Sequence, residues 1–562
     1  MNLLLSGLAA LGQHSMRDFM RKTNQADVVQ ERFLRSLLHH HQHTEVGRLF
    51  GLAEIRTIDQ FRDRVPILPY SSYEPYVERM AKGETNILTP DPVIFFNLTS
   101  GSTGKRKLIP ITKRSRQIVA RANSIAIGFA TAAARRRHIP LGKILYTSPT
   151  TLLGYTDSGI PYGPNSTSDL RLMGSLYRSV FAFPFEALQV ADTTARHYLC
   201  LLFALRQPDV GMIAATFPVL ALRLANYLEQ YGEDLVNDLQ RGTIAPWLKL
   251  EPHLRAKLER QWTAAPQRAT ELWQVLRTEG RLTPYRAFPR LAFMITARGG
   301  TSDFYFERYP EYFGDTPIFG GTYASAECVF GVHRDFGTDG VILAVENGFY
   351  EFVPEDQWEV AQPKTLLPGE VVPGQRYRIL VTNYNGFYRY DIGDVVEVEG
   401  FYNQAPIFVF RYRRGGLLSS TTEKTTEYHA VKTMQILQQM FNLSLENFCI
   451  TLAEDTIPAA YLVNIELAPG SSLTDPVTFL QQFDRTLKEV HTSYEVKRRD
   501  QVPPPRLRIL APGSFAQVRD RLIQRGATDT QLKFPNISED RTLLAGLPIE
   551  QEVRLEQPAP VA

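Results

Sequence analysis

Three short segments of this 562-residue chain combine residue types that suit nucleotide chemistry. The first, TSGSTGKRK (99–107), follows the apolar run VIFFNL (93–98). Glycines let backbone N–H groups approach a phosphate closely, while hydroxyl and basic side chains add donors and positive charge. The ATPase P-loop is excluded, because Thr99 stands where that loop needs glycine and Arg106 where it needs Ser or Thr. The segment therefore predicts a phosphate loop of another kind; the alternative is an ordinary polar turn.

The other two segments each place a carboxylate beside glycine. In GGTYASAEC (320–328), Glu327 can hold Mg²⁺ through oxygen, or the segment can be a helix N-terminus capped by Ser325. In YRYDIGD (388–394), Asp394 can accept both hydroxyls of a ribose, or the segment can be a simple β-turn. Each pattern is weak alone, and their order along one chain is what indicates a nucleotide site.

Composition places the chain among ordinary globular proteins, with 44% hydrophobic and 22% charged residues. Wholesale disorder and a collagen-like fibre are excluded. The net charge of +3 is small for this length and gives no support to nucleic-acid binding. The three cysteines lie far apart in sequence, which argues against a disulfide framework and suits a reducing compartment.

No targeting or membrane-spanning segment stands out. The N-terminal apolar run is shorter than the ~18–20 residues that cross a bilayer, and no basic region precedes it. We read it as the first turns of a packed or surface helix. We expect a cytoplasmic protein with no membrane or nucleic-acid partner, and a monomer, because the chain shows no heptad seam.

The order of elements predicts an α/β fold, because short β-rich runs alternate with the long helical stretches 114–137 and 193–206. The β-rich runs are 93–98, 143–148, 291–297 and 316–321. We expect a large N-terminal domain, a hinge whose glycines permit rotation, a smaller mobile α+β cap and a frayed tail. The predicted boundaries are 1–415 with a β-rich subdomain at about 340–412, then 416–422, 423–547 and 548–562.

Taken together, the three segments resemble the nucleotide-binding motifs of the adenylate-forming superfamily. More closely, the chain resembles the auxin-responsive Gretchen Hagen family of acyl acid amido synthetases. The resemblance covers nearly the whole chain, and its motifs are FRDRVPILPYSSYEPYVERMAKGE, LTSGSTGKRKLIPIT, YASAECVFG, YEFVP, FYRYDIGDVVEV, EKTTEYHA, DTIPAAYLVNIEL, PRLRILAPGSF and ATDTQLKFP.

That resemblance implies an ATP- and Mg²⁺-dependent ligase that works in two steps. A carboxylic acid attacks the α-phosphate of ATP to give an acyl-adenylate and pyrophosphate, and an amine, usually of an amino acid, then displaces AMP. Carried onto this sequence, the motifs imply that Glu327 ligates Mg²⁺ and that Asp394 holds the ribose. The phosphate-cradling residues would be Ser100, Gly101, Ser102, Thr103 and Gly104. The residues near the base would be Thr322, Tyr323, Ala324, Ser325 and Tyr350, with Tyr323 the stacking candidate.

Lys533, in TQLKFP, matches the late lysine that the superfamily brings to the adenylation transition state. A mobile point charge suits that task, although an ordinary surface lysine is the plain alternative.

The acid pocket has weaker candidates. By analogy, Arg121 can face a polar group of the acid and Phe217 can pack on a ring, but a surface charge and a core aromatic explain them equally well. The sequence marks no side chain as the base that deprotonates the incoming amine.

The resemblance makes the hinge testable. Two half-reactions in one cleft are served by two orientations of the cap. We expect Gly416→Pro to slow amide formation more than adenylation in single-turnover assays. Equal losses in both steps would contradict this prediction.

Two other functions stay open. An acyl-CoA synthetase-like enzyme would use the same adenylate with a thiol acceptor, but the glycine- and lysine-rich ending of such enzymes is missing from TQLKFPNISEDRTLL. A degenerate nucleotide-binding sensor would have lost the magnesium carboxylate or the late lysine, and both residues are present. Swapping the amino acid for CoA separates the two enzymes, and pyrophosphate release separates both from the sensor.

Overall fold

The computed structural model describes residues 3–100, 106–172, 174, 178–300, 302–358, 360, 362–413, 417–421, 423–453, 455–456, 458–499, 501–524, 534–540 and 542–555. Contacts divide the chain into two compact units, Met1–Phe410 and Arg411–Ala562. Several predicted positions lie outside the described residues: Gly101, Ser102, Thr103, Gly104, Gly416 and Lys533. The hinge and the function of these residues therefore stay predictions.

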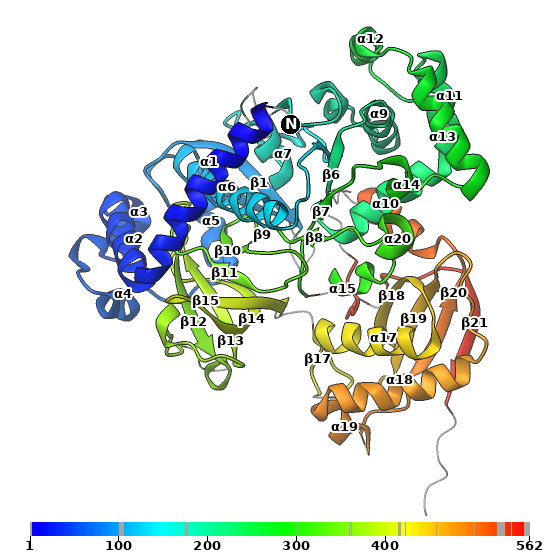
Figure 1. Ribbon diagram of the computed structural model, residues 1–562. Helices are drawn as coiled ribbons and strands as arrows, with labels where there is room; N and C mark the ends of the chain where they lie inside the picture. The colour runs from blue at the N-terminus through cyan, green and yellow to red at the C-terminus, as the bar shows by residue number, and fades with distance from the viewer. Residues whose placement is uncertain are drawn as a thin grey trace, which may run out of the picture. The chain divides into compact units, whose positions relative to one another are not determined.

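The first unit begins with helices. The predicted N-terminal helix exists as α1 (Leu3–Lys22), which packs along α6 (Lys113–Arg136) (Figure 1). Gly12 and Gly128 meet at this crossing, where a Cβ on Gly128 would collide with the backbone carbonyl of Gly12. The next helices are α2 (Ala26–His41), α3 (Glu45–Leu49), α4 (Ile58–Arg64) and α5 (Tyr70–Ala81).

Two four-stranded sheets follow. The first is antiparallel except for one pair and has the order β2-β1-β5-β4, formed by β1 (Val93–Ser100), β2 (Arg106–Thr112), β4 (Gly154–Tyr155) and β5 (Pro161–Gly163). The described ends of the predicted phosphate segment are paired strands, since Thr99 pairs with Lys107 and Ser100 with Arg106, and residues 101–105 lie outside the described part of the chain. The second sheet is parallel, in the order β3 (Lys143–Leu145), β6 (Val210–Ala214), β7 (Phe293–Ile295) and β8 (Ile318–Phe319).

Helices connect the parallel strands, as the alternation in sequence predicts. They are α7 (Asn165–Arg171), α9 (Thr193–Leu205), α10 (Pro218–Gln230), α11 (Gly232–Arg241), α12 (Pro252–Gln261), α13 (Pro266–Glu279), α14 (Pro284–Ala287), α15 (Ser302–Phe306) and α16 (Tyr309–Phe313). Asp192 caps α9 by accepting a hydrogen bond from the backbone N–H of Ala195, and eleven of the thirteen residues of α9 are buried.

The β-rich region forms an antiparallel seven-stranded sheet, in the order β12-β13-β14-β15-β11-β10-β9. Its strands are β9 (Thr322–Ala324), β10 (Val329–His333), β11 (Val341–Leu343), β12 (Phe349–Pro354), β13 (Arg376–Thr382), β14 (Tyr390–Tyr402) and β15 (Ala405–Arg413). The antiparallel prediction is correct, and the sheet also takes in β9 and β10, which precede the predicted limit of 340. This sheet carries both carboxylates that the sequence singles out.

The second unit has an α+β arrangement. A sheet in the order β18-β19-β20-β21 contains β18 (Leu445–Leu452), β19 (Tyr461–Leu467), β20 (Arg506–Leu510) and β21 (Ile549–Arg554). The other elements are β16 (Leu417–Leu418), β17 (Thr425–Thr426), α17 (Glu427–Phe441), α18 (Pro476–Val490), α19 (Thr492–Arg498) and α20 (Ser514–Gln524). The expectation of a frayed tail from residue 548 is wrong for β21, which pairs with β20 and buries Val553.

Two further expectations concern the whole chain. Among the helices that the structure describes, none is both long enough and apolar enough to cross a membrane. Cys200, Cys328 and Cys449 are all buried free thiols, as their separation in sequence predicts.

Candidate active site

The segment that contains Glu327 is the turn of a β-hairpin. β9 ends at Ala324, the backbone N–H of Ser325 donates to the carbonyl of Cys328, and β10 begins at Val329. The Ser325 hydroxyl accepts from the N–H groups of Glu327 (3.2 Å) and Cys328 (3.3 Å). The alternative of a helix N-terminus is therefore wrong, although Ser325 does satisfy backbone donors as a cap would.

The Glu327 side chain is held in a defined orientation. It is 8% exposed, and its Oε1 accepts a hydrogen bond of 3.0 Å from the Tyr390 hydroxyl. The backbone carbonyl of Glu327 accepts from the side-chain amides of Asn383 (3.0 Å) and Asn385 (3.1 Å). No described residue donates to Oε2, so that oxygen can take a cation.

Asp394 lies in a bulge of β14. Arg378 pairs with Val395 and Leu380 with Asp391, so the segment between them opposes Ile379 alone. Gly393 has a φ of 82°, a left-handed conformation that glycine adopts at little cost. The prediction of a nucleotide-facing carboxylate here is untested, whereas the alternative of a simple β-turn is wrong, because the residue belongs to a strand.

Tyr323 and Asp394 meet although 71 residues separate them. The Tyr323 hydroxyl donates to Asp394 Oδ2 at 2.6 Å, and the Tyr323 ring stacks on Phe330 with centroids 5.1 Å apart. Asp394 is 1% exposed. The structure thus brings together the two residues expected at the base and at the ribose.

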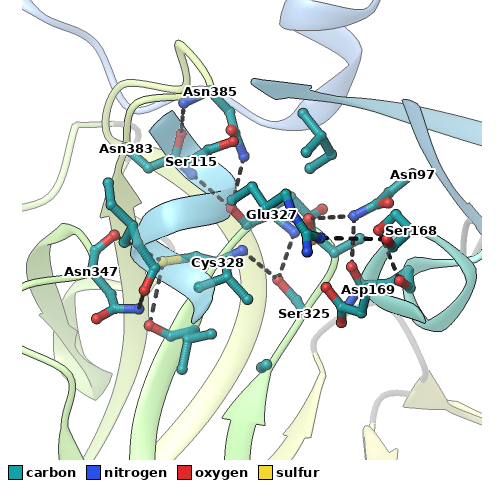
Figure 2. A pocket seen from close by; sticks show the side chains of 18 of the residues that line it. Asn97, Ser115, Ser168, Asp169, Ser325, Glu327, Cys328, Asn347, Asn383 and Asn385 are labelled. Carbon is teal, nitrogen blue, oxygen red and sulfur yellow. Dashed lines mark hydrogen bonds between the residues drawn. The ribbon is translucent and has the colours of Figure 1, made fainter. Parts of the chain in front are cut away.

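A polar pocket lies on the other face of β9. Thr322 and Ala324 line it, while Tyr323 between them points away, as alternation along a strand requires. Figure 2 shows Glu327, Ser325 and the asparagines around the pocket. The polar lining includes Asn97, Ser115, Arg116, Asn123, Asn165, Ser168, Asp169, Ser325, Glu327, Asn347, Asn383 and Asn385. The Oδ1 atoms of Asn97 and Asn385 are buried without a hydrogen-bond partner in the described part of the chain, which is unusual for a site that binds no ligand.

Asp169 and Arg116 are functional candidates that the sequence analysis missed. Asp169 lies on α7 and Arg116 on α6, and both line the pocket. Burial raises the pKa of Asp169 to about 6, and the nearby charge of Arg116 partly offsets this effect. Burial also lowers the pKa of Arg116. Neither Asp169 in STSDLR nor Arg116 in KRSR belongs to a recognisable sequence motif, so they are identified only from their positions in the fold.

Two predicted contacts do not fit the structure. Tyr350 is fully buried, and its hydroxyl donates to the Val329 carbonyl at 2.6 Å, so the ring belongs to the core rather than to a nucleotide site. Arg121 forms ion pairs with Asp18 and Glu346, and it does not line the pocket. The surface-charge alternative for Arg121 is the one that agrees with the structure.

Two other predictions stay open. Phe217 is half-buried at the start of α10, outside the lining of the pocket, and its role stays a prediction. Ser100 is the last residue of β1, directly before residues 101–105, which lie outside the described part of the chain.

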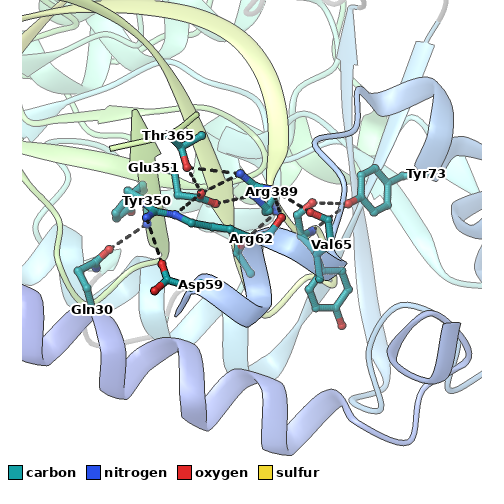
Figure 3. Close-up of polar contacts among 11 residues, drawn as sticks. Gln30, Asp59, Arg62, Val65, Tyr73, Tyr350, Glu351, Thr365 and Arg389 are labelled. Atoms are coloured by element: carbon teal, nitrogen blue, oxygen red, sulfur yellow. Dashed lines mark hydrogen bonds and ion pairs between the residues drawn. The ribbon is translucent and has the colours of Figure 1, made fainter. Parts of the chain in front are cut away.

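A buried ionic network holds the turn that leads into β14 (Figure 3). Arg389, with a φ of 43°, pairs with Glu351 through Nε–Oε2 (3.0 Å) and Nη2–Oε1 (3.1 Å). Its Nη1 donates to the carbonyls of Arg62 (2.8 Å) and Val65 (2.9 Å). Because Tyr390 is the next residue, this network fixes the side chain that orients Glu327.

The carboxylates of the site are few enough to decide how they could hold Mg²⁺. Mg²⁺ is usually held by one or two carboxylates together with substrate phosphates and waters. Within the described residues, no group of three or more His, Cys, Asp or Glu side chains could hold a metal. A single oriented carboxylate with one available oxygen, Glu327 Oε2, fits a cation that arrives with the nucleotide.

Family models cover most of the chain. The GH3 family N-terminal domain matches residues 15–318, the central domain 341–413 and the C-terminal domain 428–542. The first match alone spans more than half of the sequence. The chain belongs to the GH3 family. The predicted resemblance to the Gretchen Hagen family is therefore confirmed.

Curated relatives of this GH3 protein are amido synthetases. Probable indole-3-acetic acid-amido synthetase GH3.2 of Oryza sativa subsp. japonica is 27% identical over 546 residues, covering 91% of this chain and 88% of the relative. Jasmonoyl–L-amino acid synthetase JAR4 of Nicotiana attenuata is 26% identical, covering 92% of each. The predicted enzyme class, an acid–amino acid ligase, is confirmed by these relatives.

Solved structures confirm the fold. The GH3.15 acyl acid amido synthetase superposes with a TM-score of 0.84 at 24% identity, covering 96% of each chain. A 2-hydroxyisobutyryl-CoA ligase superposes with a TM-score of 0.55 at 12% identity, covering 92% of this chain and 90% of that one. The predicted α/β fold, with a large N-terminal and a smaller C-terminal domain, is correct.

Proposed function

We propose that this GH3 protein uses ATP to convert a small carboxylic acid into an acyl-adenylate and pyrophosphate, and then transfers the acyl group to the amine of an amino acid. The observation that carries this proposal is the placement of Glu327 and Asp394. The Glu327 carboxylate lines a polar pocket, and the Tyr390 hydroxyl fixes its orientation. The Asp394 carboxylate accepts a hydrogen bond from the Tyr323 hydroxyl.

We further propose individual roles for these residues. Asp394 accepts the ribose hydroxyls, and the Tyr323 hydroxyl fixes the carboxylate for that task. Glu327 Oε2 would hold Mg²⁺, which when bound neutralises charge on the phosphates. Residues Ser100 to Gly104 would bind phosphate, and Lys533 would add positive charge during adenylation. Phosphoryl transfer depends mainly on such positioning and charge neutralisation, and these residues are of the types that supply both.

The substrates are proposed only as classes. Relatives are named for indole-3-acetic acid and for jasmonoyl conjugates, which supports a carboxylic acid and an amino acid as the pair. Three buried free thiols agree with a reducing compartment, so we propose that the enzyme works in the cytoplasm. We also propose a monomer, because the sequence shows no heptad seam.

The test is pyrophosphate release with ATP and Mg²⁺ over a panel of aryl, indolyl and fatty acids, each with and without pooled amino acids. Acid-dependent release together with an amide detected by mass spectrometry is the expected result. Acid-dependent release that gives a product only with CoA would contradict the amide step. Nucleotide binding without release on any acid of the panel would favour the degenerate sensor.

Asp394→Asn is expected to raise the KM for ATP by about 10- to 100-fold, because a hydrogen bond to a charged acceptor contributes about 1.5–3 kcal/mol. The substitution keeps the size of the side chain and an oxygen that can accept from Tyr323. Asp356→Asn, at an exposed position in the same unit, is the matched control. An unchanged KM for ATP in the Asp394 variant would remove this residue from the ribose site.

A further inference from the structure

The pocket that contains Glu327 also contains two opposite charges that are not paired with each other. Asp169 and Arg116 both line it, yet no ion pair within 4.0 Å joins them. Among the described residues, Arg116 Nη1 donates to the Ser168 carbonyl alone, at 3.4 Å. Within the described residues, the Asp169 carboxylate has neither a hydrogen-bond nor an ion-pair partner, although it lies near enough to Arg116 to feel its charge. Figure 2 shows Asp169 beside Ser168, across the pocket from Asn385.

An unpaired anion and an unpaired cation in one pocket suit a ligand with both charges. Asp169 and Arg116 are both partly buried. A charge that is partly withdrawn from water and has no partner is costly, and a bound counter-charge reduces that cost. An acid substrate would satisfy Arg116 alone and would be repelled by Asp169. An amino acid in its zwitterionic form offers an ammonium to one side chain and a carboxylate to the other.

We propose that Asp169 and Arg116 form the amino acid site, in which Arg116 binds the α-carboxylate and Asp169 binds the ammonium and accepts its proton. This assignment rests on the proposed function and deepens it, because it names the base that the sequence analysis could not find. Asp169 and Arg116 would both touch substrate.

Asp169 is better suited to act as the base than the other titratable groups of the pocket. The described lining residues include five titratable groups and no histidine; the five are Arg116, Asp169, Glu327, Cys328 and Tyr384. Burial raises the pKa of the Cys328 thiol to about 12, so it stays protonated. Glu327 Oε1 already accepts from Tyr390, and its other oxygen is assigned to the cation.

The surroundings of Asp169 suit a proton acceptor near neutral pH. In the described part of the chain, the groups that interact with the charge of Asp169 are Arg116 on α6 and Tyr146, which follows β3. Burial raises the pKa of Tyr146, which therefore stays neutral. A pKa of about 6 for Asp169 leaves the carboxylate mostly ionised at pH 7, with enough basicity to take a proton efficiently.

The ammonium gives one proton to the Asp169 carboxylate, and the freed nitrogen lone pair attacks the carbonyl carbon of the acyl-adenylate. A C–N bond forms, the bond from the carbonyl carbon to the phosphate oxygen breaks, and AMP leaves with that electron pair. The second nitrogen proton passes to solvent, and Asp169 then releases the first.

Asp169→Asn separates proton acceptance from other roles. We expect acid-dependent ATP–pyrophosphate exchange to stay within about threefold of the unaltered enzyme, while amide formation falls about 10²–10⁴-fold, the usual contribution of a general base. Hydroxylamine is largely unprotonated at neutral pH, so hydroxamate formation should change little. Asp157→Asn, an exposed turn residue, is the matched control.

Arg116→Met tests the carboxylate contact. We expect the KM for the amino acid to rise at least about tenfold, and the KM for the corresponding amino acid amide, which lacks the α-carboxylate, to stay unchanged. A rise of the same size for both acceptors would overturn this half of the proposal.

The unaltered enzyme supplies a measurement that does not depend on whether a variant folds. Single-turnover amide formation should rise with pH through an apparent pKa near 6, since the base works in its deprotonated form. A flat profile there would overturn the assignment, as would equal losses of exchange, hydroxamate and amide in Asp169→Asn. Absence of acid-dependent exchange in the unaltered enzyme would overturn the proposed function itself, which is a distinct outcome.

Discussion

Glu327→Gln is expected to lower acid-dependent pyrophosphate exchange by about 10²–10³-fold, the range found when one electrostatic group is removed from a transition-state site. The amide keeps the length of the side chain and can still accept the hydrogen bond from Tyr390, so only the negative charge is lost. We therefore expect the thermal unfolding temperature to stay within about 2 °C of the unaltered protein. Exchange rates and calorimetry on the same samples measure both quantities.

Tyr390→Phe provides a graded comparison for this prediction. It removes the hydroxyl that orients Glu327 but leaves the carboxylate in place, so we expect a loss of about tenfold, the size of one hydrogen bond to a charged group. Raising the Mg²⁺ concentration should restore part of the activity of Tyr390→Phe and none of that of Glu327→Gln. Undiminished exchange in Glu327→Gln would mean that this carboxylate does not serve the metal.

The sequence predicted most of the elements that carry the site, because they depend on local patterns. The apolar run before Ser100 is β1, and the alternation over 340–412 is an antiparallel sheet. The local geometry of the two carboxylates was less predictable. Glu327 follows a hairpin strand rather than opening a helix, and Asp394 sits in a bulge, because pairing with the neighbouring strands β10 and β13 overrides the local preferences of Ser325 and Gly393.

Contacts between distant residues explain what the sequence could not give. Asp169 on α7 and Arg116 on α6 line one pocket because both helices are positioned by the same pair of strands. Helix α7 packs on β1, and α6 follows β2, which pairs with β1. Tyr350 carries an aromatic ring and a hydroxyl that suit a nucleotide, yet β12 turns it into the core, where its hydroxyl donates a hydrogen bond to the Val329 carbonyl. Ile549–Arg554 reads as a polar tail, since an exposed edge strand needs few apolar residues.

We expect the largest loss of stability in the first unit when the ion pair between Arg389 and Glu351 is broken. Both side chains are almost fully buried, and Glu351 also accepts from Thr365 (2.6 Å) and from Arg62 (3.3 Å). Glu351→Gln leaves the Arg389 guanidinium without its counter-charge. We expect the free energy of unfolding of this unit to fall by about 3–5 kcal/mol, the usual cost of breaking a buried ion pair from one side.

Tryptophan fluorescence in urea measures this loss selectively, because all four tryptophans (Trp247, Trp262, Trp273 and Trp358) lie in the unit Met1–Phe410. Unfolding of the second unit therefore does not enter the signal, and a transition of the first unit can be fitted by itself.

Glu31→Gln is the matched control, since Glu31 pairs with Arg35 on the exposed face of α2 and the same change there should cost less than about 1 kcal/mol. The double variant Glu351→Leu with Arg389→Met should cost about 1–3 kcal/mol less than the sum of its single variants, because it removes both buried charges together. If Glu351→Gln costs no more than Glu31→Gln, the network does not stabilise the turn before β14. The position of Tyr390, and through it the orientation of Glu327, would then depend on strand pairing alone.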